Sequence, residues 1–145
     1  MVRSAPPPFE VLEHTADVGL RARGRTLGEV FANAALGLAE ILGRRVEGSA
    51  DGSRVAVRVS STDLEALLVD WLNEVLFELE RREACLAGAR VREVRAGEAP
   101  AVEGELLVLE CPEAPEGTEV KAATYHQLSV RAEEGGYRAT VYFDV

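Results

Sequence analysis

The sequence is poor in the residues that build many metal and redox sites. Its 145 residues include two histidines and two cysteines, and aromatic residues make up 6% of the chain. The cysteines, Cys85 and Cys111, form no Cys-x-x-Cys pair, so the ligand spacing of a structural zinc site is missing. We expect both to be free, partly buried thiols with a structural role in a reducing compartment.

Lysine is almost absent from this chain. Of the 16 basic residues 15 are arginine, and Lys121 is the single lysine. Lysine differs from arginine in being a compact point charge with a shiftable pKa. The presence of a single lysine at position 121 therefore suggests a functional role for it. Acidic residues outnumber basic ones by 25 to 16, and the net charge is −9. Such a balance argues against a surface that grips nucleic acid and suits a basic protein partner.

Long apolar runs, repeats and linkers are also missing. No segment approaches the roughly 20 apolar residues that a membrane helix needs, and the proline-containing start has no signal-type apolar region. We therefore expect a cytoplasmic protein without a membrane partner. Hydrophobic residues make up 47% of the chain, which is enough for a core. The organisation expected is a flexible arm over residues 1–8 and one domain over residues 9–145.

The periodicity of the apolar residues predicts an α+β fold. Capping boxes at Thr26–Glu29 and Thr62–Glu65 open two segments whose apolar residues recur with helical spacing. Alternating or apolar segments predict strands over residues 9–23 (one extended strand, with a bend allowed at 15–17), 54–60, 89–95, 102–111, 119–131 and 137–145. We predict a two-layer domain, with a mostly antiparallel sheet and two amphipathic helices packed on one face.

The last two residues of the chain combine hard oxygen ligands. Asp144 and Val145 follow a segment that still alternates like a strand, and they bring a side-chain carboxylate next to an α-carboxylate. A further carboxylate, Asp17, lies in the unusual stretch His14–Gly19. Oxygen ligands of this kind suit calcium or magnesium rather than zinc. The hypothesis requires that the two regions meet in the fold.

A predicted hairpin brings other polar residues towards Asp144. With a turn at Gly135–Gly136, Asp144 would face Gln127, and with a turn one residue earlier it would face Tyr125. His126 lies between these two positions. It alternates in step with the apolar residues of its strand, which is more typical of a histidine in the core. On a straight strand Lys121 would lie roughly 20 Å from the Asp144 position. Only a bend or bulge near Tyr125 would bring it close.

Four segments, in this order, resemble the motifs of the archease family. They are His14–Gly19, Asp70–Phe77, Glu119–His126 and Phe143–Val145, and the match extends from about Phe9 to Val145. No single motif is decisive, but four of them in order within a chain of this length are highly specific.

The resemblance implies a protein that is not itself an enzyme. It would activate the tRNA-splicing RNA ligase RtcB, promoting guanylylation of the ligase by GTP and its multiple turnover. It implies a divalent cation, calcium first and magnesium or manganese as alternatives, held by Asp17, Asp144 and Val145. Lys121 would take part in activation.

The resemblance also bears on the neighbouring residues and on the nucleotide. His14, Tyr125 and His126 would contribute to activation or partner contact. The chain has no P-loop or G-x-G-x-x-G segment, so GTP would be bound through the ligase. No direct contact with nucleic acid is expected.

Two other classes remain open. A stand-alone metal-dependent phosphoesterase or nuclease could use Asp17, Asp144 and His126 to hold an ion that activates water, although a second base and a basic substrate surface are not obvious. A small chaperone-like interaction module would turn part of its apolar stripes outward. Turnover of RNA by the protein alone would favour the first class, and suppression of client aggregation without a ligase would favour the second.

Overall fold

The computed structural model describes residues 6–13, 17–47, 52–111 and 116–145. The elements in chain order are β1 (Phe9–Glu13), β2 (Asp17–Gly24), α1 (Leu27–Leu42), β3 (Ser53–Ser60), α2 (Leu64–Arg82), β4 (Ala84–Arg95), β5 (Ala101–Glu110), β6 (Ala122–Glu133) and β7 (Gly136–Asp144). The predicted α+β class, with two helices and antiparallel strands, is confirmed. Within the described residues, no helix has the length and apolar character needed to cross a membrane.

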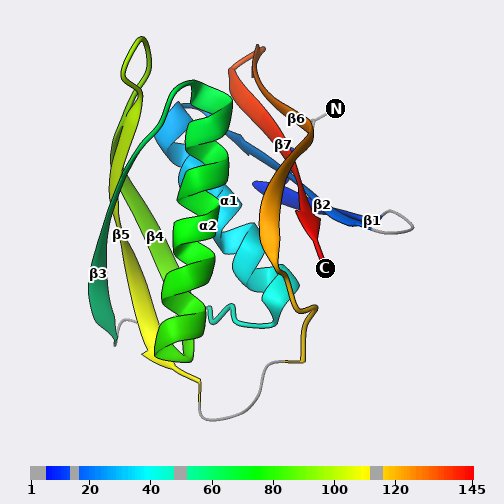
Figure 1. Cartoon of the computed structure of the whole chain (residues 1–145), viewed down its shortest axis with the longest axis vertical. Coiled ribbons are helices and arrows are strands. Elements are labelled where there is room, and N and C mark those ends of the chain that lie inside the picture. Colours follow the sequence, from blue (N-terminus) through cyan, green and yellow to red (C-terminus); the bar gives the residue numbers. More distant parts are fainter. Residues whose placement is uncertain (1–5, 14–16, 48–51, 112–115) are drawn as a thin grey trace, which may run out of the picture.

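The strands are divided between two sheets. A four-stranded sheet has the order β1-β2-β7-β6, and a three-stranded sheet has the order β3-β5-β4. Both helices contact both sheets, and Figure 1 shows the helices lying between them. The prediction was one sheet with the helices on one face. Periodicity could not separate the two arrangements, because a strand of either sheet buries one face and exposes the other.

Helix α1 is apolar on most of its surface because it lies between the sheets. Nine of its 16 residues are buried. The predicted capping box is confirmed at its start: the hydroxyl of Thr26 accepts from the main-chain N–H of Glu29 at 3.1 Å, and the Glu29 carboxylate accepts from that of Arg25 at 2.6 Å. The helix ends at Gly43, whose φ of 71° is accessible to glycine at little cost.

Helix α2 buries the predicted apolar stripe and is tied to α1 by a hydrogen bond. The buried Trp71 donates from its indole Nε1 to the carbonyl oxygen of Phe31 at 2.9 Å. The helix begins one residue later than predicted, because the N-cap is Asp63 rather than Thr62. The Asp63 carboxylate accepts from the main-chain N–H of Ala66 at 2.8 Å. Both residue types are good N-caps, so sequence alone does not choose between them.

Polar side chains of α2 make specific contacts with their neighbours. Asp70 accepts a hydrogen bond from the Ser61 hydroxyl at 2.8 Å. Glu78 pairs with Arg82 at 2.7 Å and with Arg81 at 3.0 Å. The hydrogen bond from Arg82, followed by that from Arg81, lowers the pKa of Glu78 against the opposing effect of burial. These contacts tie polar side chains of α2 to their neighbours.

The segment predicted as one extended strand over residues 9–23 is a hairpin. Strands β1 and β2 pair antiparallel, from Glu13 opposite Val18 to Phe9 opposite Ala22. The prediction of a single strand is therefore wrong. Alternation is the same in one long strand and in two strands that reverse, and the residues between the two strands, 14–16, lie outside the described residues.

The prediction of free thiols is also wrong, because Cys85 and Cys111 form a disulfide. Their Cα atoms are 5.5 Å apart. Strands β4 and β5 form a hairpin, and the disulfide joins its open end, where the main-chain N–H of Cys111 donates to the carbonyl oxygen of Glu83. The sequence spacing could not show this, since the pairing of the strands creates the proximity. The inference of a reducing compartment rested on free thiols and loses that support.

We expect the disulfide to stabilise the fold measurably. Replacing both cysteines by serine should lower the free energy of unfolding by about 3 kcal/mol, because the cross-link spans a sequence separation of 26 residues and restricts the unfolded chain. Urea unfolding of the wild type should shift to a lower midpoint when a reductant is added. The Cys85→Ser/Cys111→Ser variant should not respond to reductant. A wild type that is equally indifferent would contradict the cross-link.

Candidate functional site

The site is built where β2 begins and β7 ends. Asp17 and Asp144 are directly opposite each other in the antiparallel pairing of these two strands. Residues in this relation point to the same face, with Cβ atoms about 4.5–5.5 Å apart. Asp17 is half-buried and Asp144 is exposed. The two chain regions therefore meet, as the cation hypothesis requires.

The register of β2 and β7 follows from which side chains they bury. Leu20 and Val141 are opposite each other, at 0% and 1% exposure, and belong to the core with the helices. A slip by one residue would turn this apolar set outward. Asp17 and Asp144 have the opposite parity, so their carboxylates project from the outer face of the four-stranded sheet.

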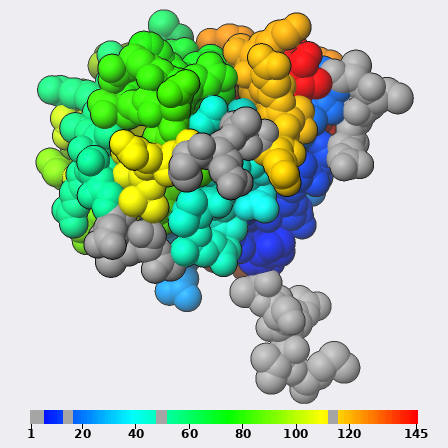
Figure 2. All heavy atoms as spheres, turned by 90° about the horizontal axis from the view of Figure 1, so that it is seen from below, coloured from blue at the N-terminus to red at the C-terminus, as the bar shows by residue number. Residues whose placement is uncertain are grey.

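Lys121 lies immediately beside Asp144. Its main-chain N–H donates to the carbonyl oxygen of Asp144 at 2.8 Å, and the next residue, Ala122, is opposite Asp144. The Lys121 side chain is exposed. In Figure 2 the C-terminal end of the chain (red) lies at the surface beside the start of β6 (orange). The main chain of Lys121 is therefore next to that of Asp144, while the Lys121 side chain lines a hollow with Asn73 and Phe77 of α2.

A bulge in β6 brings Lys121 to this position. The tight turn of the β6–β7 hairpin falls at Glu134–Gly135, with Glu133 opposite Gly136, so regular pairing would place Asp144 opposite Tyr125. The register instead jumps between Thr124 and Ser129, where β6 has three more residues than β7 (four against one). The predictions that Asp144 faces Tyr125 or Gln127 are therefore wrong. The extra residues move the pairing to Ala122.

The bulge also displays Tyr125 and His126 away from the core. Tyr125 is 63% exposed and His126 is exposed. The main-chain N–H of His126 donates to the hydroxyl of Thr124 at 3.3 Å, and its ring stands edge-on to Tyr142 at 6.0 Å between centroids. Gln127 takes a positive φ of 52°, which is uncommon for a residue with a side chain. His14 lies outside the described residues.

Sequence reasoning missed the role of Asn73. Its side-chain oxygen accepts a hydrogen bond from the main-chain N–H of Ala123 at 2.8 Å. In the part of the chain that the structure describes, β6 is an edge strand, so the main-chain N–H of Ala123 has no strand to bond on its outer side. Asn73 supplies the missing acceptor and ties the start of β6 to α2. The sequence did contain a signal for this role, because Asn73 is an uncharged residue of low helix propensity on a largely acidic helix face.

The donor set suits a hard cation and leaves most of its coordination open. Asp17 and Asp144 supply two carboxylates, and the main-chain oxygens of Val145, which is 43% exposed, adjoin them. Calcium takes six to eight oxygen ligands. Across the described ranges, no group of three or more His, Cys, Asp or Glu side chains could hold a metal. Oxygens from water or from a partner would have to complete the shell.

The chain is similar to known proteins along nearly its whole length. It matches the Archease protein family over residues 9–145. A protein archease from Methanosarcina mazei is 40% identical over 142 residues, with 94% of this chain and 95% of the relative covered. A protein archease from Methanothermobacter thermautotrophicus is 33% identical over 138 residues, with 94% and 98% covered.

Solved structures show the same fold. The solution structure of Methanobacterium thermoautotrophicum protein 1598 superposes with a TM-score of 0.75 at 29% identity, covering 95% of this chain and 99% of that one. The crystal structure of an archease described as a possible chaperone, from Thermotoga maritima, gives a TM-score of 0.62 at 23% identity over all of both chains. The second likeness is one of fold alone.

We expect Asn73 to be needed for the local structure of the site. In Asn73→Ala the N–H of Ala123 loses its acceptor, which should lower the free energy of unfolding by about 1–2 kcal/mol. Asn73→Asp keeps an acceptor oxygen in the same place and should retain most of the stability. Urea unfolding measures both, and amide exchange of Ala123 should be faster in the alanine variant alone. Equal stability and exchange in the wild type and Asn73→Ala would contradict this role.

Proposed function

Because the chain belongs to the archease family, we propose that it activates a tRNA-splicing RNA ligase of the RtcB type. In this role it promotes guanylylation of the ligase by GTP and allows multiple turnover in the cytoplasm, without catalysing a reaction of its own. One observation carries the proposal: Asp17, Asp144 and the main chain of Lys121, from three distant segments, meet at one end of the four-stranded sheet.

The convergence involves the segments that resemble the family. Asp17 comes from the first of these segments, Lys121 from the third and Asp144 from the last. A structural role in the core would not require it, since Asp144 and Lys121 are exposed. Exposed polar residues that the fold holds in register are a common signature of binding surfaces.

Asp17, Asp144 and the main-chain oxygens of Val145 would hold a divalent cation, calcium in the first place and magnesium or manganese as alternatives. Such an ion supplies positive charge for phosphate oxygens. Lys121 adds a second positive charge on a flexible stem. Held next to the nucleotide site of the ligase, the cation and Lys121 would stabilise the charge that develops on the triphosphate as pyrophosphate leaves.

The nucleotide itself is assigned to the ligase. The chain has no glycine-rich phosphate-binding segment. The end of the sheet that carries Asp17 and Asp144 offers charges rather than a cradle of main-chain N–H groups. The net charge of −9 suits docking onto a basic ligase.

The contacts in the structure favour neither rival class, although the Thermotoga maritima archease is described as a possible chaperone. The apolar stripes of both helices are buried in the core, whereas a chaperone-like module would turn some of them outward. A stand-alone nuclease would need His126 to join Asp17 and Asp144 around one ion, and among the described residues these three side chains do not form such a group. The bulge instead sets His126 against the ring of Tyr142.

Cation binding can be tested on the protein alone. We expect calcium to bind the wild type in a calorimetric titration and to bind Asp17→Asn/Asp144→Asn at least about tenfold more weakly, because both charged ligands are lost. Glu134→Gln, which removes an exposed carboxylate from the hairpin turn, is the control and should bind as the wild type does. If the double variant binds calcium as tightly as the wild type does, the proposed cation site is wrong.

Activation can be tested with a purified RtcB-type ligase, GTP and Mn²⁺. Adding the wild-type chain should convert a single turnover of RNA joining into many. Asp144→Asn and Lys121→Ala should each reduce the turnover rate by about tenfold or more, because each removes a charge that stabilises the transferring phosphates. Lys121→Arg tests whether a compact ammonium is required. Glu134→Gln should activate normally.

Two results would contradict the proposal at different levels. Normal activation by Asp144→Asn would remove the cation from the mechanism. A wild-type chain that leaves guanylylation and turnover of the ligase unchanged would overturn the proposed function itself.

A further inference from the structure

The outer face of the three-stranded sheet is basic, although the protein as a whole is acidic. Five exposed arginines, which we call the arginine face, lie on its two edge strands: Arg54 and Arg58 on β3 and Arg90, Arg92 and Arg95 on β4. Glu93, Glu103 and Glu105 share this side of the sheet. Five positive charges against three negative ones give a local balance of +2, compared with −9 for the chain.

The sheet register separates paired arginines from unpaired ones. On β3, Arg54 pairs with Glu105 at 3.4 Å and Arg58 pairs with Glu103 at 3.2 Å. The central strand β5 supplies both of these glutamates. Arg90, Arg92 and Arg95 of β4 make no side-chain hydrogen bond or ion pair with any residue that the structure describes. The free positive charge therefore follows β4.

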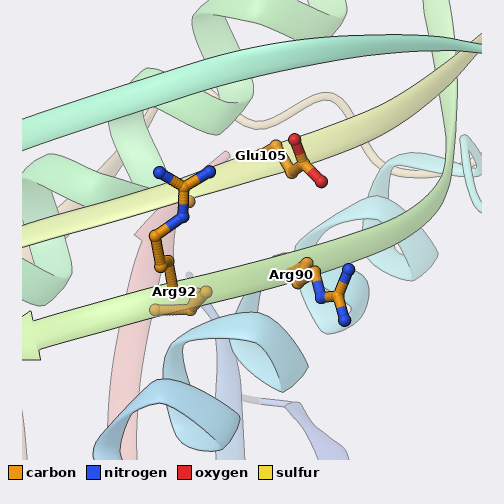
Figure 3. Close-up of a pocket in the computed structure, with 5 residues that line it drawn as sticks. Arg90, Arg92 and Glu105 are labelled. Carbon is orange, nitrogen blue, oxygen red and sulfur yellow. The ribbon is translucent and has the colours of Figure 1, made fainter.

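Two of the β4 arginines border a hollow in the sheet surface. Arg90, Val91, Arg92, Gly104 and Glu105 line a volume of about 360 Å³. In Figure 3 the Arg92 side chain reaches from β4 across to β5, whereas the Arg90 side chain extends away from β5. The pairing of β4 with β5 shifts register between Val91 and Glu93, which places Arg92 at a bulge. A second hollow, which includes Arg54 and Gly88, adjoins the first at Arg90 and Glu105.

Free guanidinium groups in a row are suited to a chain of phosphates. Arginine binds phosphate oxygens through parallel hydrogen bonds. Residues two apart on a strand are roughly 7 Å apart and residues three apart roughly 10 Å apart, so Arg90, Arg92 and Arg95 offer successive contacts along one edge of the sheet. A positively charged track of this kind binds a flexible single strand rather than one small anion.

We propose that the arginine face binds the phosphodiester backbone of single-stranded RNA. The choice of RNA rests on the proposed function, in which the partner of this protein joins RNA ends. The contacts are independent of base sequence, because they go to phosphates. The expectation of no nucleic-acid contact followed from the net charge, which averages over this face.

The test is a titration of the full chain into a fluorescent single-stranded RNA of about 20 nucleotides, followed by anisotropy, without any ligase. At about 50 mM salt we expect a dissociation constant on the order of 10⁻⁴ M or tighter. The logarithm of affinity should fall with the logarithm of salt with a slope of about −2, as about three phosphate contacts on a single strand require.

Arg90→Ala/Arg92→Ala should weaken binding about fivefold or more at low salt and make the salt slope shallower by about one. The matched control is Arg25→Ala/Arg131→Ala, which removes the same charge from exposed arginines on other elements. The control should retain most of the binding. Equal losses in both variants, or no binding by the wild type, would overturn the proposal. Thermal unfolding should show both variants folded.

A second readout separates this inference from the proposed function. Guanylylation of the ligase by GTP without RNA should be activated equally by the wild type and Arg90→Ala/Arg92→Ala. If activation is normal and RNA does not bind, the arginine face is wrongly assigned and the proposed function stands. If RNA binds and guanylylation is not activated, the proposed function fails and the arginine face stands.

Discussion

The pairing of β2 with β7 is the interaction on which the candidate site depends. It joins a strand near the start of the sequence to the last strand, and the burial of Leu20 against Val141 holds its register. A shift by a single residue would expose that apolar pair and separate Asp17 from Asp144. The site is therefore held by core packing, while its own side chains remain accessible on the outer face.

The bulge of β6 is the second constraint. It adds three residues to one strand of a hairpin, so Asp144 is opposite Ala122 instead of Tyr125. The hydrogen bond from Ala123 to Asn73 connects the start of this strand to α2, and Trp71 connects α2 to α1. Lys121 thus stands on a segment that is anchored to the helical layer, which limits its movement relative to the aspartate pair.

The three-stranded sheet shows how strand pairing redistributes charge and covalent bonds. The same register that sets Glu103 and Glu105 against the β3 arginines leaves Arg90 and Arg92 without an ion pair to any described residue. The pairing of β4 with β5 also brings Cys85 and Cys111 together at the open end of their hairpin, where they form the disulfide. Net charge and cysteine spacing are properties of the whole sequence, and neither reveals which residues the sheet brings together.

Features that depend on nearby residues could be predicted from the order of amino acids alone. Helical periodicity, the capping of α1 by Thr26 and the α+β class follow from contacts within a few positions, and the four motif segments were enough to indicate the family. The β1–β2 hairpin, the second sheet, the disulfide and the position of Lys121 emerge only when the chain folds. Each of these depends on register between strands, which is set by how the whole core packs, and alternation along one strand is the same for every register that buries the same face.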